Sequence, residues 1–429
     1  MDSTQRTASS GDVSLVRGWI IFAAPTALFI LVQALRTILS STVEEVESIF
    51  TVGAASFAFA SGIYFFFYAP SQLVSGLFVD WVGSRYVLFA SGLLCGLSTL
   101  IFALGHDFIA LATARAISGF ASGVPLLVAI YLASIWLPLN RLPLATGLSN
   151  GLGALGSFLA VWFLPALIGM SSWATVMFWF TGVWVLFSIL MLVMVPRRPE
   201  WAMPSGHIPD IRKVLSGVLV VLRIKRFWVL TMIASCNVSP LAILGGLWGA
   251  RYLELIRGWS HSDASLAAGT VFLGFTVGAI LSGFIGQSRV LVRLAAIGAG
   301  LVSALATMGL VLLGHYPPTV GIGLMFFVGV GTGFVSLMYA LVAIITKPEH
   351  RAIGTALILF PTMAGSGITQ AISGRIVQTA ESKDAHLETA FNMALLFPAA
   401  LSLVGVLIAL LAVIHAILYA KHSESPASH

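Results

Sequence analysis

Charge and cysteine are scarce in this sequence. Only 9% of its 429 residues are charged, while 58% are hydrophobic and the mean hydropathy is +1.00. A soluble chain of this length would have about a quarter of its residues charged, so the composition excludes a soluble multidomain protein. The two cysteines, Cys95 and Cys236, lie within apolar runs, which excludes a disulfide framework and a cysteine-based metal site.

Acidic residues are absent from the middle of the long apolar runs. All 16 Asp and Glu fall in tails, in polar breaks or at the ends of runs. The nine His include no pair four residues apart, so no metal site is predicted. The net charge of +6 is spread over many breaks rather than gathered into a stripe with interleaved aromatics, which argues against nucleic-acid binding.

Long apolar runs fill the chain. A membrane-spanning helix needs about 20 apolar residues. Twelve runs meet this requirement: 18–40, 53–78, 86–104, 108–136, 145–168, 173–195, 227–250, 264–285, 290–313, 319–345, 353–377 and 390–420. Their length excludes the strands of a membrane barrel, which alternate every second residue over about ten residues. The sequence therefore predicts an all-α integral membrane protein with twelve transmembrane helices.

The longest polar break, Pro196 to Arg226, divides the predicted helices six and six. We therefore predict an N-terminal bundle over 1–195, a linker over 196–226 and a C-terminal bundle over 227–429. The basic, amphipathic linker fits either the inner membrane surface, where Lys and Arg meet anionic headgroups, or a solvated tether.

Basic residues are distributed asymmetrically over the polar breaks. Sixteen of the 22 Lys and Arg fall on the side that carries both termini, and at most four fall on the other side. Because cytoplasmic segments carry the excess of Lys and Arg, both termini are predicted to be cytoplasmic. The expected location is the cell (inner) membrane, as a multi-pass protein whose first run is a retained span and not a removed signal.

A charged hinge with the sequence GLFVDWVGSR joins the second and third runs. Ten residues between two apolar runs are too few for a domain, so the two helices are expected to lie side by side and antiparallel. The spacing of Gly76, Asp80, Gly83 and Arg85 resembles the signature loop of the major facilitator superfamily. The resemblance implies that this loop is a latch that stabilises an outward-open state, whereas a solvated turn is the alternative.

The fourth run is similar to the second signature of that superfamily, a leucine followed by an arginine and then by glycines. Leu111, Arg115, Gly119 and Gly123 occupy these positions at a spacing of four. Glycines at this spacing permit close helix contact, so Gly119 and Gly123 join the predicted gating residues. The resemblance covers essentially the whole chain and implies two six-helix bundles that move a small solute by alternating access.

A narrower similarity concerns the first helix. The strings ALRTILSSTVEEVESIF and LWGARYLE are similar to the branch of the superfamily that carries organophosphates and other small organic anions. In that branch an arginine on the first helix commonly helps to hold the anion, and Arg36 occupies the similar position. The fifth run, GLSNGLGALGSFLA, lacks the glycine-proline pair typical of drug antiporters, which argues against drug export.

Two arginines lie inside apolar runs, where charge is costly and function is the first hypothesis. Arg36 could contact an anion or snorkel to the interface, and Arg115 could contact substrate or serve structure and gating. Polar and aromatic residues on helices 1, 2, 4 and 7 complete the predicted substrate site, which comprises Arg36, Gln33, Arg115, Tyr64, Tyr68, Asn237 and Trp248. No catalytic residue, metal or cofactor is predicted.

The lack of a carboxylate in mid-membrane favours an anionic substrate, because carriers of cationic drugs or neutral sugars usually need a titrating acid there. Protons or a counter-anion are the expected coupling partners. Two alternatives stay open: a sensor that binds ligand without net transport, and an exporter of a drug or a metal chelate. An enzyme is not expected, because the strings GLSNG and GLGALG lie in one apolar helix rather than at a strand-to-helix turn.

Overall fold

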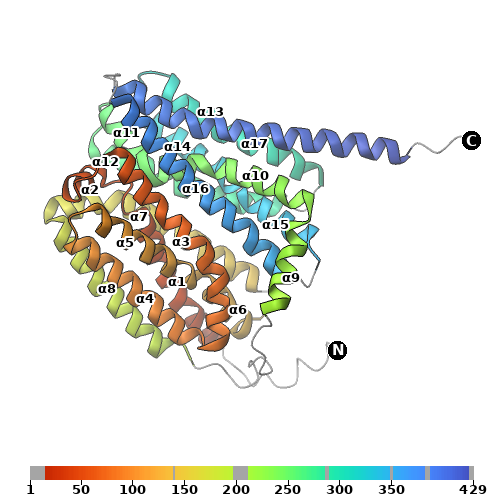
Figure 1. The fold of residues 1–429 in the computed structure, drawn as a ribbon, viewed down its shortest axis with the longest axis horizontal. Coiled ribbons are helices and arrows are strands. Elements are labelled where there is room, and N and C mark those ends of the chain that lie inside the picture. The colour runs from red at the N-terminus through yellow and green to blue at the C-terminus, as the bar shows by residue number, and fades with distance from the viewer. Residues whose placement is uncertain are drawn as a thin grey trace, which may run out of the picture.

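The computed structural model describes residues 15–138, 141–196, 211–285, 289–347, 351–381 and 387–424. Every regular element within these ranges is a helix (Figure 1). Eleven described helices or helix pairs are long and apolar enough to cross a bilayer, and α2 with α3 makes up to twelve. The prediction of an all-α membrane protein with twelve spans is confirmed.

Each predicted span corresponds to one helix or to two or three consecutive helices. The bounds are α1 (Leu15–Thr37), α2 (Val43–Ile49), α3 (Ala54–Trp81), α4 (Ser84–Leu104), α5 (Phe108–Ser122), α6 (Val124–Trp136), α7 (Leu142–Met170), α8 (Trp173–Met194), α9 (Ile211–Leu222), α10 (Lys225–Pro240), the π-helix η4 (Leu241–Trp248), α11 (Gly249–Leu255), α12 (His261–Ile285), α13 (Arg289–Leu312), α14 (Pro318–Gly333), α15 (Val335–Ile345), α16 (Arg351–Glu381) and α17 (Leu387–Glu424).

Three predicted single helices are interrupted. Gly123 separates α5 from α6, where Pro125 lacks the N–H that would continue the first helix. Pro240 ends α10, and the chain continues as the π-helix η4, a form that usually marks a functional position. Phe334 separates α14 from α15. Interrupted spans leave backbone carbonyls available to side chains in the interior of the protein.

Helices α1–α8 lie together on one side of the molecule and α10–α17 on the other (Figure 1). We call these groups the N half and the C half. Two helix pairs make most of the contact between them, because α3 packs along α16 and α7 packs along α12. The grouping supports the predicted bundles 1–195 and 227–429, whose limits stay a prediction.

The connections between spans fall at two ends of the molecule. The hinge end carries the turn at Val82–Gly83 and the starts of α1, α7 and α10. The opposite end, which we call the vestibule end, carries the connections 38–53, 105–107, 171–172, 256–260 and 313–317. The two ends are the two places where an alternating-access protein would open.

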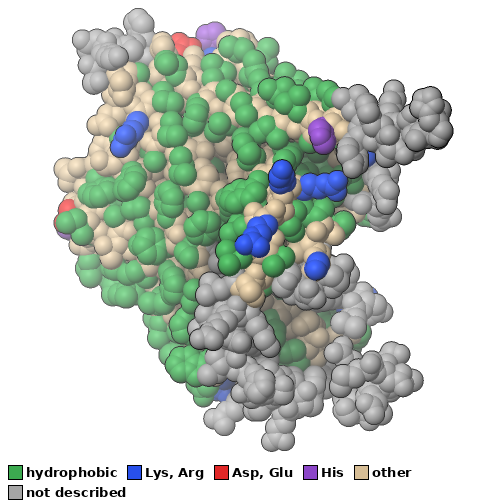
Figure 2. All heavy atoms as spheres, turned by 45° about the vertical axis from the view of Figure 1, so that its right-hand side comes forward, with side chains coloured by type: hydrophobic (Ala, Val, Ile, Leu, Met, Phe, Trp, Pro, Cys, Tyr) green, Lys and Arg blue, Asp and Glu red, His purple; other side chains and the backbone are tan. Residues whose placement is uncertain are grey.

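The flanks of the helices are covered with apolar side chains (Figure 2). Phe163, Trp179 and Leu407 are each more than half exposed, at 52%, 56% and 54%. Exposed apolar side chains on long helices form the surface that lipid hydrocarbon covers. Figure 2 also shows Lys and Arg gathered beside one another on this face. Basic side chains are exposed at the start of α10, and the cytoplasmic location of the hinge end stays a prediction.

Part of the predicted linker 196–226 is helical, whereas residues 197–210 lie outside the described part of the chain. Helix α9 follows, and its Val221 is fully buried against Phe227 and neighbouring apolar side chains of the C half. Residues 211–222 therefore do not form a wholly solvated tether: α9 packs on protein at Val221, while Leu219 and Val220 are 57% and 40% exposed.

The backbones of α3 and α16 touch where two glycines face each other. A Cβ atom on Gly62 would lie 2.6 Å from the carbonyl oxygen of Gly367, and one on Gly367 would lie 2.8 Å from the carbonyl oxygen of Gly62. Any larger side chain must separate the two helices. The N half and the C half thus meet through a contact that only glycine permits.

Replacing Gly62 with leucine is expected to lower the melting temperature of the purified protein. Overpacking of this kind costs about 1–3 kcal/mol, because neighbouring backbone has to move. Thermal unfolding in detergent measures the effect. The matched control is Gly182→Leu in α8, where no atom lies within 4 Å of an added Cβ. Equal melting temperatures for the two variants would show that α3 and α16 separate at little cost.

Candidate substrate site

Arg115 is completely buried and binds the backbone of two neighbouring helices. Its Nη1 atom donates to the carbonyl oxygens of Leu35 and Arg36, both at 3.4 Å, and its Nη2 atom donates to that of Ser61 at 3.1 Å. Leu35 and Arg36 lie in the last turn of α1, where carbonyls have no partner within the helix. Arg115 therefore caps α1, and its positive charge suits that helix end.

Two stacked tyrosines continue from Arg115 toward the C half. The guanidinium of Arg115 lies 4.6 Å from the ring centre of Tyr64, whose ring stacks on Tyr68 at 5.8 Å. The hydroxyl of Tyr68 accepts a hydrogen bond from Gln72 Nε2 at 2.9 Å. Met363 of α16, which no sequence pattern singled out, packs against these tyrosines from the other half. The predicted residues Arg115, Tyr64 and Tyr68 thus form one cluster.

Arg36 reaches from the N half to the C half. Its guanidinium carbon lies 5.8 Å from the ring centre of Phe272 on α12. Within the described part of the chain, Arg36 has neither a hydrogen bond nor an ion pair from its side chain, and the side chain is half-buried. One helical turn earlier, Gln33 is 8% exposed and its Oε1 atom has no described partner. Arg36 and Gln33 therefore lie close together on α1, and both have polar side-chain groups without a described partner.

Among the described residues, no ion pair joins Arg36 or Arg115 to an acid. Helices α1, α5 and α7 contain no Asp or Glu, and the acids of α3 and α12, Asp80 and Asp263, stand at helix ends. Two buried or half-buried guanidiniums in a medium of low dielectric repel each other and lack a counter-charge. An anion placed between the halves would supply that counter-charge.

The C half contributes amide groups to the interior. Asn237 is 5% exposed, and its Nδ2 atom donates to the carbonyl oxygen of Gly331 at 3.3 Å while its Oδ1 atom has no described partner. Gln370 of α16, which sequence reasoning missed, donates from Nε2 to the carbonyl oxygen of Ala242 at 2.9 Å. Ala242 lies in the π-helix after Pro240. The sequence feature that could have pointed to Gln370 was therefore Pro240, which breaks the helix that Gln370 contacts.

Trp248 is placed within the packed contact between the halves. The side chain is fully buried, its Nε1 atom donates to Ser373 Oγ at 3.0 Å, and its ring lies against Phe57 and Phe391. In this conformation Trp248 joins α3 of the N half to α16 and α17 of the C half. The structure does not bring it beside Arg36 or Arg115 through any described contact, and its role as a substrate contact stays a prediction.

The signature loop adopts the conformation that its glycine permits. Gly83 has φ +93°, in the left-handed region that favours glycine, and it connects α3 directly to α4. The Arg85 guanidinium lies 6.0 Å from the ring centre of Tyr86. Gly76 and Asp80 belong to α3, but their surroundings lie outside what the structure describes. The latch therefore stays a prediction.

Gly119 and Gly123 lie where α5 crosses α3. A Cβ atom on Gly119 would collide with the backbone of Tyr64, and one on Gly123 would collide with the Ser71 hydroxyl. Both glycines allow the close helix contact that their spacing predicts. Their contribution to gating stays a prediction.

An ion pair joins the two halves at the vestibule end. Arg251 Nη1 of α11 lies 2.7 Å from Glu47 Oε2 of α2, and both side chains are about one-fifth exposed, at 20% and 17%. Sequence reasoning did not single out this pair. The sequence indicated only that residues 38–53 and the end of the seventh span lie at the same end of the molecule, which permits such a pair without identifying it.

Comparison with known proteins agrees with this architecture. The family model described as Major Facilitator Superfamily matches residues 26–338 of this chain. Monosaccharide-sensing protein 1 of Arabidopsis thaliana is 28% identical over 144 residues, which are 33% of this chain and 20% of that protein. The matched segment thus spans about a fifth of the length of that curated relative.

Solved structures share the fold at low sequence identity. A bacterial homologue of the human lysosomal transporter Spinster, inward-facing and unoccupied, has a TM-score of 0.75 and 15% identity over 96% of this chain and all of that chain. A D-xylose–proton symporter has a TM-score of 0.68 and 13% identity over 91% of this chain and 97% of that chain. These likenesses support the fold, and the family match covers most of the sequence. The chain belongs to the major facilitator superfamily, whose members are secondary transporters of small solutes and not enzymes.

Proposed function

We propose that this transporter carries a small organic anion and that Arg36 is its principal contact. The observation that carries the proposal is the Arg36 guanidinium, which spans from α1 to Phe272 of α12 without a described hydrogen bond or ion pair. A guanidinium presents paired N–H groups that match a carboxylate or a phosphate. Binding of an anion there would touch both halves at once.

Arg115 is proposed to stabilise the anion through its charge, because its terminal N–H groups are already used in hydrogen bonds. Both of its terminal nitrogens already donate to carbonyl oxygens of α1 and α3. Its charge still acts through the interior, where screening by water is weak. Gln33, Tyr64, Tyr68 and Asn237 are the neutral groups proposed to select among anions.

Alternating access follows from the two interfaces between the halves. The contacts of α3 with α16 and of α7 with α12 are proposed to act as the pivot, and the Glu47–Arg251 ion pair holds the vestibule end together in this conformation. We propose that the hinge end faces the cytoplasm and the vestibule end the outside of the cell (inner) membrane. Protons or a counter-anion are the proposed coupling partners.

Arg36→Gln is expected to reduce anion transport about tenfold or more. A charge-assisted hydrogen bond contributes about 1.5–3 kcal/mol, and 1.4 kcal/mol corresponds to a factor of ten. Uptake and exchange in proteoliposomes, measured across a panel of carboxylates and phosphate esters, test the effect. The control is Arg141→Gln, an exposed arginine at the hinge end of the N half. Unimpaired transport by Arg36→Gln would show that Arg36 does not contact the substrate.

A ligand sensor is the second candidate function. One relative is named for monosaccharide sensing, although the similarity covers a small part of that protein. The same proteoliposomes separate the two functions, since a sensor would bind a ligand that it does not move. Transport of a drug or a metal chelate in place of the anions would favour the exporter that the sequence left as an alternative.

A further inference from the structure

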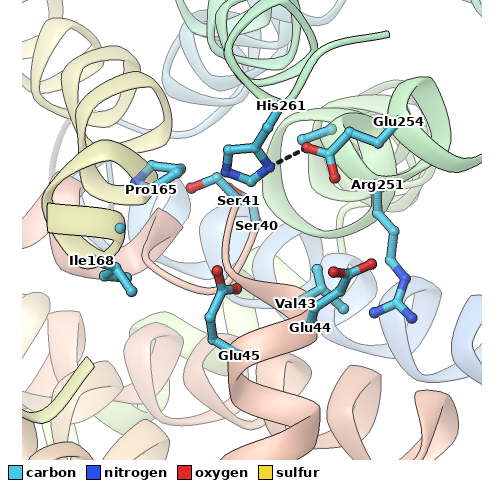
Figure 3. A pocket seen from close by; sticks show the side chains of 12 residues that line it. Ser40, Ser41, Val43, Glu44, Glu45, Pro165, Ile168, Arg251, Glu254 and His261 are labelled. Atoms are coloured by element: carbon cyan, nitrogen blue, oxygen red, sulfur yellow. Dashed lines mark ion pairs between the residues drawn. The ribbon is translucent and has the colours of Figure 1, made fainter. Parts of the chain in front are cut away.

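A polar cavity of about 250 Å³ lies between the two halves at the vestibule end. Figure 3 shows Glu44 and Glu45 rising into it from α2, with His261 of α12 and Glu254 of α11 on the facing side. Ser41 also lines the cavity, is 4% exposed, and its hydroxyl has no described hydrogen-bond partner. A cavity of this size and polarity admits water, which can deliver and remove protons.

The charges in this cavity are unequal. Arg251 is paired with Glu47, and the Nδ1 atom of His261 lies 2.6 Å from Glu254 Oε1. Glu44 and Glu45 have no described ion pair of their own, and they belong to the N half while His261 belongs to the C half. Without a positive charge on His261, carboxylates of the two halves face each other across the cavity and repel.

His261 lies at the vestibule end of α12, ahead of the apolar sequence of that helix. It is the first residue of that helix, its side chain is 47% exposed, and the apolar sequence begins at Ala264. Glu254 raises the pKa of the His261 imidazole most, Glu45 and Glu44 raise it further, and partial burial opposes them.

The other charged neighbours of His261 are accounted for. Arg251 lines the cavity but is held by Glu47. Asp263, on the same helix as His261, accepts a hydrogen bond from Ser260 at 2.7 Å. The cavity-lining residues of α7, which include Pro165 and Ile168, carry no charge. The carboxylates of α2 and α11 are therefore the groups that decide the charge state of His261.

We propose that His261 is a proton-binding site that fastens the two halves together at the vestibule end. The Nδ1 atom of His261 lies 2.6 Å from Glu254 Oε1, and the imidazolium that proton binding creates also attracts Glu44 and Glu45 of the opposite half. Loss of that proton to water returns a neutral imidazole and leaves the carboxylates unbalanced. Proton binding thus stabilises the conformation that is closed at the vestibule end.

The direction of the pH effect follows from the raised pKa. The closed state gains its full stabilisation from His261 at a pH below the pKa that this group has in the open state. The stabilisation is lost as the pH rises through the higher pKa of the closed state. Acid is therefore expected to close the vestibule end and alkali to open it. This inference requires alternating access but not an anionic substrate.

Spin labels at the vestibule end test the proposal without any substrate. Met170 of the N half and Leu313 of the C half are 85% and 59% exposed and are replaced by cysteine in a chain carrying Cys95→Ala and Cys236→Ala. Double electron–electron resonance of the full chain in phosphatidylcholine nanodiscs measures the distance distribution from pH 5 to pH 9. The long-distance population is expected to grow as the pH rises.

Three variants assign the effect to His261. His261→Gln is expected to abolish the pH dependence, whereas His315→Gln, an exposed histidine at the same end, retains it. Glu254→Gln keeps the imidazole and is expected to move the midpoint to lower pH by about one unit or more, the usual effect of one opposite charge. A pH-independent distance in the parent chain, or a pH dependence that survives in His261→Gln, would overturn the proposal.

Discussion

Arg115→Leu is expected to abolish transport and to lower the thermal stability of the protein together. The change removes the donors that cap the carbonyl oxygens of Leu35 and Arg36 and leaves them buried. Each buried polar group that loses its partner costs about 1–3 kcal/mol. The end of α1 also carries Arg36, so loss of the cap misplaces the proposed anion contact. We therefore expect the largest single effect in the molecule at Arg115.

Melting temperature and transport, measured on the same preparation, separate structure from recognition. Arg36→Gln is expected to reduce transport while changing the melting temperature little, because its guanidinium has no described hydrogen bond to lose. Arg115→Lys keeps the charge but cannot reach three carbonyl oxygens at once, and is expected to be intermediate in both measurements. An Arg115→Leu protein with normal stability and selective loss of anion binding would instead make Arg115 a direct substrate contact.

The helices of this protein could be predicted because hydrocarbon demands long apolar runs, and such runs are visible in one sequence. Their interruptions could be predicted only in part. Pro240 indicated a disturbance in the seventh span, but the π-helix from Leu241 to Trp248 depends on its partners, among them Gln370. The short helix α2 lies in a break too brief and too polar to show a period.

The candidate site was visible where a single residue was unusual by itself. Arg36 and Arg115 stood out because charge within an apolar run is costly. The hydrogen-bond acceptors of Arg115 could not be predicted, because every residue has a backbone carbonyl and the sequence does not indicate which ones Arg115 reaches. Pairings between the halves were equally hidden: Glu47 and Arg251 are 204 residues apart, and each is an ordinary residue of a helix end.

The Glu47–Arg251 pair gives the second large expected effect. Each of the single variants Glu47→Arg and Arg251→Glu places two like charges at the contact between the halves, and both are expected to favour opening of the vestibule end. A charge-assisted hydrogen bond contributes about 1.5–3 kcal/mol, so removing it shifts the open-to-closed ratio by about tenfold or more before repulsion is added. The exchanged pair, Glu47→Arg with Arg251→Glu, is expected to restore closure.

Reaction of a cysteine at position 41 with a membrane-impermeant maleimide measures this shift. Ser41 is 4% exposed in the closed vestibule, so Ser41→Cys in the chain lacking Cys95 and Cys236 should react slowly. Either single charge reversal should accelerate the reaction, and the exchanged pair should slow it again. Glu388→Arg, a charge reversal at the start of α17, is the control and should leave the rate unchanged. If the exchanged pair reacts as fast as the single variants, the ion pair does not hold the halves together at the vestibule end.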